Sequence, residues 1–122
     1  MGKMPIIKLK KSIIPSCDVD SLEKLGKLVK ATCSVNGVGA YKIGFELVIP
    51  SGMKKVVKAI RKYTKLPIIY DHQKAGTDIP DMGDKFMKAC QLVDAVILFP
   101  QAGPETEVAW IKAAQQSKMK VI

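Results

Sequence analysis

Aromatic side chains, cysteines and histidine are all scarce in this chain. One tryptophan, three tyrosines and three phenylalanines form no visible platform on which nucleic-acid bases could stack. Cys17, Cys33 and Cys90 lie far apart, and none belongs to a Cys-x-x-Cys pair, which argues against both a disulfide framework and a zinc site. His72 is the only histidine, so it could bind a metal only with help from carboxylates. We therefore expect reduced thiols, no metal and no cofactor.

Long apolar runs are also missing. No stretch approaches the roughly 20 apolar residues that a membrane span requires. Lysines interrupt the apolar residues near the amino terminus, so this segment lacks the core of a signal peptide. The composition, 48% hydrophobic and 25% charged over 122 residues, is typical of one soluble globular domain. We expect a single domain over residues 1–122, located in the cytoplasm and making no membrane contact.

The formal net charge of +9 raises the alternative of nucleic-acid binding, which predicts affinity that falls steeply with salt. The lysines are, however, spread over every expected helix without interleaved aromatics. We favour solvated helix faces and expect no nucleic-acid partner. A positive field of this kind would also attract a small anionic substrate.

Apolar strand-like runs alternate with amphipathic helical patterns along the chain. Strands are expected at residues 12–17, 40–45, 66–71, 94–99 and 118–122, and helices at 22–33, 51–60, 84–92 and 104–117. The strands begin about 26 to 28 residues apart, which is the length of a βα unit in a parallel sheet. A doubly wound sheet of about five strands fits this length, whereas a complete eightfold barrel needs about 250 residues. The pattern is therefore α/β, with about four βα units and a fifth strand.

Charged residues recur at or near the carboxyl ends of these expected strands. Asp18 follows the first, Lys42 lies within the second, and Asp71 and Lys74 follow the third. Carboxyl ends of parallel strands converge on one mouth, so these side chains could be neighbours. A lysine inside an apolar strand needs an acidic partner if it points into the sheet interior, and Asp71 or Asp18 is the natural choice for Lys42.

The segment 70–80 places two carboxylates, Asp71 and Asp78, around Lys74. If the three groups share a cleft, the carboxylates hold the lysine protonated, and together they form a preorganised charge network with a proton to give. A solvated charged turn is the alternative.

Four segments together resemble orotidine 5′-phosphate decarboxylase. Residues 16–23 are similar to that family's first strand and turn, and residues 41–44 to its Lys-x-Gly second strand. Residues 71–80 resemble its third-strand signature of aspartate, lysine, aspartate, isoleucine and proline, and residues 102–104 its continuation after the fourth strand. The similarity covers nearly the whole chain in order, apart from about the first ten residues.

The resemblance implies a TIM-type (β/α) barrel of which this chain is the amino-terminal portion. It also implies decarboxylation of orotidine 5′-monophosphate to uridine 5′-monophosphate, a step of pyrimidine biosynthesis, without a cofactor. Lys74 would protonate C6, Asp71 would lie beside the departing carboxylate, and Lys42 between the carboxylates and the ribose. Asp18 would accept from a ribose hydroxyl, and Asp78 would cross the interface of a homodimer.

This chain departs from the family in spacing. The usual signature is Asp-x-Lys-x-x-Asp, whereas Asp71, Lys74 and Asp78 have one extra residue in each gap. Alternate strand residues share a face, so the extra residue turns Lys74 away from Asp71 unless a bulge or an early strand end restores the geometry. Sister activities on sugar phosphates, decarboxylases or synthases of the same superfamily, therefore stay open.

The family's loops for phosphate and pyrimidine follow its later strands, and these 122 residues contain no glycine-rich cradle that would replace them. A partial barrel would also leave strand edges unpaired, which promotes association. We expect this chain to be the amino-terminal part of a decarboxylase that is inactive alone. Its carboxyl-terminal half would either belong to the same protein or be supplied by a complementing chain. A non-catalytic assembly module is the alternative.

Overall fold

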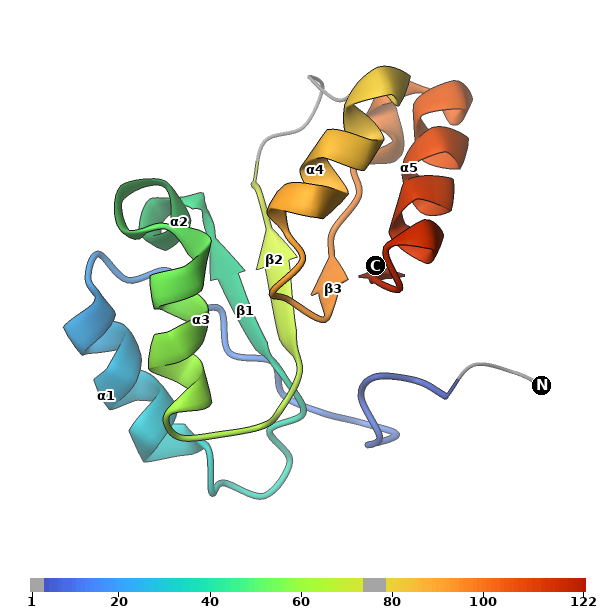
Figure 1. Cartoon of the computed structure of the whole chain (residues 1–122). Helices are drawn as coiled ribbons and strands as arrows, with labels where there is room; N and C mark the ends of the chain where they lie inside the picture. Colours follow the sequence, from blue (N-terminus) through green and yellow to red (C-terminus); the bar gives the residue numbers. More distant parts are fainter. Residues whose placement is uncertain (1–3, 74–78) are drawn as a thin grey trace.

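The chain alternates helices with the strands of one parallel sheet (Figure 1). This computed structural model describes residues 4–73 and 79–122. In this part of the chain the sheet has the order β1-β2-β3-β4, and every pair is parallel. The strands are β1 (Tyr41–Gly44), β2 (Ile68–Asp71), β3 (Ala95–Val96) and β4 (Lys120–Val121). The α-helices are α1 (Leu22–Thr32), α2 (Phe45–Ser51), α3 (Met53–Arg61), α4 (Gly83–Ala89) and α5 (Pro104–Gln116), with 3-10 turns η1 (Pro80–Met82) and η2 (Pro100–Ala102).

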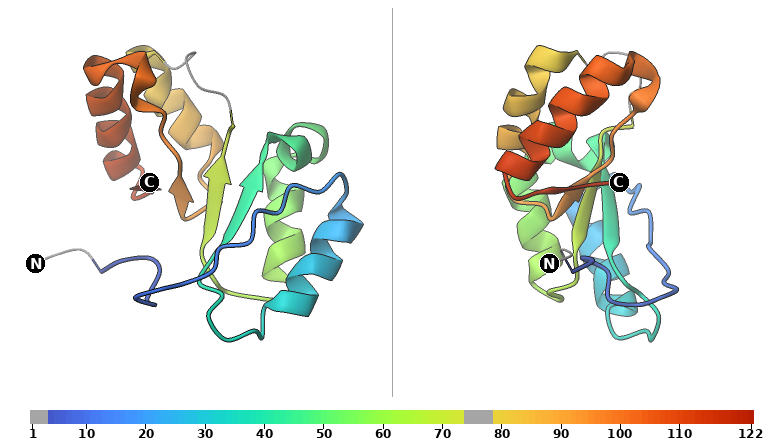
Figure 2. Two further views of the ribbon diagram at one scale, coloured as in Figure 1. Left: turned by 180° about the vertical axis from the view of Figure 1, so that it is seen from behind. Right: turned by 90° about the vertical axis from the view of Figure 1, so that its right-hand side faces the viewer.

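All five of these helices pack on one face of the sheet. Tyr41 and Ile43 of β1 and Ile68 and Tyr70 of β2 join one buried cluster with apolar residues from every helix. Residues of the other face form a small separate cluster, in which Ala40, Ile69 and Ala95 are covered by Ile6 and Ile7 among others. The right-hand view of Figure 2 shows the amino-terminal segment on the side of the strands opposite to α3. Helices on a single face are the arrangement of a barrel wall, whereas a doubly wound sheet carries them on both faces.

The expected first strand, residues 12–17, was only partly correct. The segment lies beside β1 but forms isolated bridges, between Ile13 and Val38 and between Ser16 and Lys42. Pro15 lacks an N–H group and therefore cannot donate to a ladder, although its carbonyl accepts from the Lys42 amide at 3.0 Å. The segment still continues the parallel order at the edge of β1.

Several element boundaries also differ from expectation. Residues 45–51 form helix α2, which the sequence pattern did not predict, and β1 ends at Gly44. Pro50 lies inside α2 rather than ahead of the next helix, and α2 ends at Ser51, before Gly52 with its φ of 80°. The fourth expected strand, 94–99, is reduced to Ala95–Val96.

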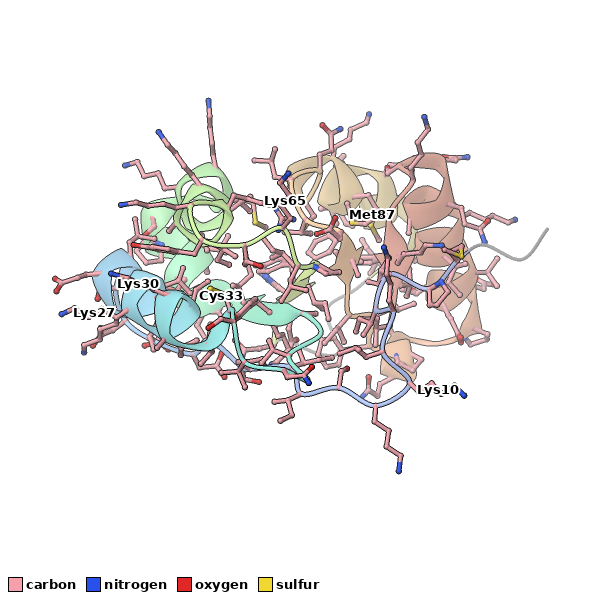
Figure 3. All side chains as sticks on the ribbon, turned by 90° about the horizontal axis from the view of Figure 1, so that it is seen from below. Lys10, Lys27, Lys30, Cys33, Lys65 and Met87 are labelled. Atoms are coloured by element: carbon pink, nitrogen blue, oxygen red, sulfur yellow. The ribbon has the colours of Figure 1, made fainter. Side chains whose placement is uncertain are left out.

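Lysines lie around the outside of the molecule. Figure 3 shows Lys10 and Lys27 at opposite ends of the view, while Met87 lies inside and is fully buried. Exposed ion pairs join Lys24 to Asp20 and Lys27 to Glu23 on α1. The net positive charge is thus distributed over several elements.

Candidate active site

The carboxyl ends of β1 and β2 bring Lys42 and Asp71 together. Lys42 Nζ donates to Asp71 Oδ2 at 2.8 Å, and the side chains are only 20% and 13% exposed. The register pairs Lys42 with Ile69 and Gly44 with Asp71, so Lys42 and Asp71 lie on the face away from the main helical core. Lys42 thus has one of the two acidic partners that the sequence offered, and the pairing compensates the burial of both charges.

Both carboxylate oxygens of Asp71 are occupied. Oδ2 accepts from Lys42, and Oδ1 accepts from the backbone N–H of Gln73 at 3.0 Å. Gln73 has φ 58°, in the left-handed region, directly after β2 has ended at Asp71. The strand therefore ends at Asp71, the residue at which the sequence pattern also ended it.

Asp18 lies at the same end of the sheet but does not join the ion pair directly. The neighbouring Cys17 amide donates to the Lys42 carbonyl at 2.8 Å, which holds the segment against β1. The exposed Asp18 carboxylate accepts from Gln73 Nε2 at 3.3 Å. Gln73 therefore links Asp18 to Asp71, a connection that sequence reasoning missed because nothing in the spacing marks Gln73.

The other two predicted site residues, Lys74 and Asp78, lie outside the described residues. Their roles therefore stay predictions. The described residues on either side, Gln73 and Ile79, are both held by hydrogen bonds.

An aromatic cluster lies between β2 and the helices α4 and α5. Tyr70 Oη and His72 Nδ1 are 2.7 Å apart, and the ring of Phe86 stacks near both Tyr70 and Trp110. Burial raises the pKa of Tyr70 to about 12, so the hydroxyl stays protonated at neutral pH. Trp110 Nε1 donates to the Ile79 carbonyl at 2.8 Å, which fixes the chain just after the charged segment. No pattern in the sequence marks this contact, which spans 31 positions.

The thiol of Cys17 lies beside the charge network without serving as a nucleophile. Burial, and secondarily the charge of Asp18, raise its pKa to about 11. A protonated, fully buried thiol is unreactive.

An open hollow of about 610 Å³ lies at the opposite, amino-terminal ends of the strands. Its described lining includes Lys8 and Lys65 and contains no acid. The hollow is therefore separate from the charge network and lacks paired acid and base groups.

Among residues 4–73 and 79–122, no group of three or more histidine, cysteine, aspartate or glutamate side chains could hold a metal ion. None of the described helices combines the length and apolar character needed to cross a bilayer.

Several solved structures have a fold similar to that of this chain. The chain superimposes on orotidine 5′-monophosphate decarboxylase from Methanocaldococcus jannaschii complexed with the inhibitor BMP, with TM-score 0.80 and 26% identity, covering 91% of this chain and 50% of that one. A second structure of the M. jannaschii enzyme gives TM-score 0.72 and 26% identity, covering 91% of this chain and 52% of that one. Orotidine 5′-phosphate decarboxylase from Pyrococcus horikoshii OT3 gives TM-score 0.65 and 22% identity, covering 88% and 48%.

No family model matches the chain, and no curated protein matches it in sequence. The chain spans about half the length of the solved structures that it matches. Parallel strands, helices on one face and this partial coverage are consistent with the amino-terminal portion of a TIM-type barrel. The chain therefore has an orotidine 5′-monophosphate decarboxylase-like fold.

Proposed function

We propose that this chain supplies the charge network of an orotidine 5′-monophosphate decarboxylase, a cofactor-independent carboxy-lyase of pyrimidine biosynthesis in the cytoplasm. The observation that carries the proposal is the ion pair of Lys42 and Asp71 at the carboxyl ends of adjacent parallel strands. It occurs in a fold whose solved neighbours at 26% identity are named as this decarboxylase.

The proposed chemistry is electrostatic. Lys74 protonates the carbanion that develops at C6, and Asp71 lies beside the departing carboxylate. Asp71 also keeps the network charged, Lys42 lies between the carboxylates and the ribose, and Asp18 accepts a hydrogen bond from a ribose hydroxyl. Fixed charges that complement the carbanion better than the substrate lower the barrier, because little reorganisation is then needed during the reaction.

The proposed partners follow from the same scheme. The substrate is orotidine 5′-monophosphate, and the protein acts as a homodimer in which Asp78 contributes to the neighbouring site. The remaining half of the barrel, with its phosphate and base contacts, belongs to the same protein or to a complementing chain.

The test is a fusion of residues 1–122 to the second half of the M. jannaschii enzyme. We expect this barrel to convert orotidine 5′-monophosphate, and Lys42→Ala to lower kcat/KM by about 100-fold, since one preorganised electrostatic group typically contributes this much. Lys74→Ala should abolish turnover. Lys65→Ala is the matched control, because this lysine lies at the opposite ends of the strands and should leave turnover unchanged.

A folded fusion that neither binds BMP nor turns over substrate would contradict the proposal. If the Lys74→Ala fusion were as active as the unsubstituted fusion, the result would favour a non-catalytic module. The unfused chain should show no turnover.

A further inference from the structure

Gln73 occupies a strained position at the mouth of the sheet. Its φ of 58° lies in the left-handed region, which costs a residue with a Cβ about 1 kcal/mol or more. Such a conformation persists where surrounding contacts hold it. The contacts here are the Asp71 carboxylate, which accepts from the Gln73 amide, and the Asp18 carboxylate, which accepts from its side chain.

Gly44 makes room for the Gln73 side chain. The backbone of Gly44 has φ −118°, which any residue can adopt, so glycine is not needed there for conformation. Glycine matters at position 44 because it leaves space for a neighbouring side chain. A Cβ there would overlap Oε1 of Gln73 and lie 2.8 Å from Cδ of Gln73. The Asp18 carboxylate oxygen Oδ1 would be only 3.3 Å away. The exposed Gln73 side chain therefore lies over Gly44 and beside the exposed Asp18, and the three residues come from separate segments.

We propose that Gln73 is a positioning residue, which uses the space above Gly44 to fix the Asp18 carboxylate beside the Lys42–Asp71 pair. Among residues 4–73 and 79–122, Gln73 provides the side-chain hydrogen bond to Asp18. One carboxylate oxygen is thereby held by the amide, and the other is directed to a ligand hydroxyl. The ligand role of Asp18 rests on the proposed function, whereas the packing of Gln73 over Gly44 does not.

A double-mutant cycle on the chain itself tests the packing. Gly44→Ala should lower the urea midpoint in the original background, because the new methyl group displaces the Gln73 side chain. In the Gln73→Gly background the same substitution should leave the midpoint nearly unchanged, since glycine tolerates the left-handed backbone and has no side chain to displace. Equal losses in both backgrounds would overturn the proposal.

Side-chain amide NMR tests the positioning. Asp18→Asn should shift the Gln73 Nε2–H resonances, whereas Asp20→Asn, which changes an exposed acid paired with Lys24, should not. An unchanged Gln73 amide in Asp18→Asn would show that no link exists and would overturn the proposal. Neither experiment depends on enzyme activity.

The functional consequence is measurable in the fused barrel. Gln73→Ala should raise KM about tenfold, because the hydrogen bond that holds the Asp18 carboxylate is lost. The value of kcat should change by less than about twofold. An inactive fusion together with the expected NMR shifts would overturn the proposed function and leave the positioning role intact. An active fusion in which Gln73→Ala keeps the original KM would overturn the positioning role alone.

Discussion

Burial raises the pKa of several individual side chains, and three of the shifts are large. It raises the pKa of Cys17 from 9.0 to about 11, of Cys90 from 9.0 to about 12 and of Tyr70 from 10.0 to about 12. In each case the neutral, protonated form is favoured because the charged form would lose its hydration. The folded chain therefore binds these protons more tightly than the unfolded chain does.

Stability should consequently fall on the alkaline side. A raised folded-state pKa contributes stability that is fully present below the unfolded value, about 9 for a thiol, and is lost as pH rises toward the folded values of about 11 to 12. We expect the urea midpoint to decrease between pH 8 and pH 11, beyond any effect of the lysines. The decrease should be smaller in a Cys17→Ala, Cys90→Ala variant, with Cys33→Ala as the half-buried control. An equal decrease in all three proteins would contradict this assignment.

At the scale of elements, α4 and α5 are joined to the charged segment by one indole. Trp110 of α5 is 3% exposed, contacts the ring of Phe86 and donates to the Ile79 carbonyl. A Cβ on Gly83 would lie 3.1 Å from Trp110 Cδ1, so the small residue allows η1 and α4 to approach α5 closely. This contact fixes the position of Ile79 beside α5.

Trp110→Phe should destabilise the chain by about 1 kcal/mol, because the ring is largely retained but the N–H donor to Ile79 is lost. Trp110→Ala should cost about 3 to 5 kcal/mol, since the buried ring is lost as well. Val108→Ala is the control, because this side chain on the same helix is 50% exposed. Urea denaturation measures all three, and a Trp110→Phe variant as stable as the control would show that the hydrogen bond contributes nothing.

At the scale of the whole molecule, the two faces of the sheet differ. The helical face buries a large continuous cluster, whereas the opposite face has a small one covered partly by Ile6 and Ile7. Large apolar side chains are also exposed around the molecule, among them Phe45, Ile49, Ile79 and Met82. Ile79 and Met82 are close in sequence and next to Asp78, so they are candidates for an association surface of the kind that exposed apolar patches mark.

We therefore expect two copies of the chain to associate through a contact that includes Ile79, the neighbour of Asp78 in the sequence. The chain should sediment as a dimer, and Ile79→Lys should shift it toward monomer because a charge would then be buried in the contact. Val35→Lys is the control, since Val35 is similarly exposed, at 50%, at the other end of the sheet. A monomer at all accessible concentrations, or equal effects of the two substitutions, would contradict a dimer built through this region.

Local pattern predicted the elements that have strong periodicity. The stripe of Met53, Val56, Val57 and Ile60 predicted α3, and Pro104 after Gly103 predicted the start of α5. Helix α2 was missed because residues 45–51 are short, rich in apolar residues and contain a proline, so local propensity favoured a strand end. Lys42 was singled out because a lysine in an apolar strand requires an acid, and Asp71 is that acid.

Apolar periodicity and parallel pairing dictate the βα order, the buried strands and the convergence of Asp18, Lys42 and Asp71 at one end of the sheet, so the residues alone predict all three. The common face of the helices, the link from Asp18 through Gln73 to Asp71 above Gly44, and the hold of Trp110 on Ile79 become visible only in the folded chain. These contacts join segments separated by tens of residues, and their geometry depends on side-chain volume and backbone angle, which no local pattern encodes.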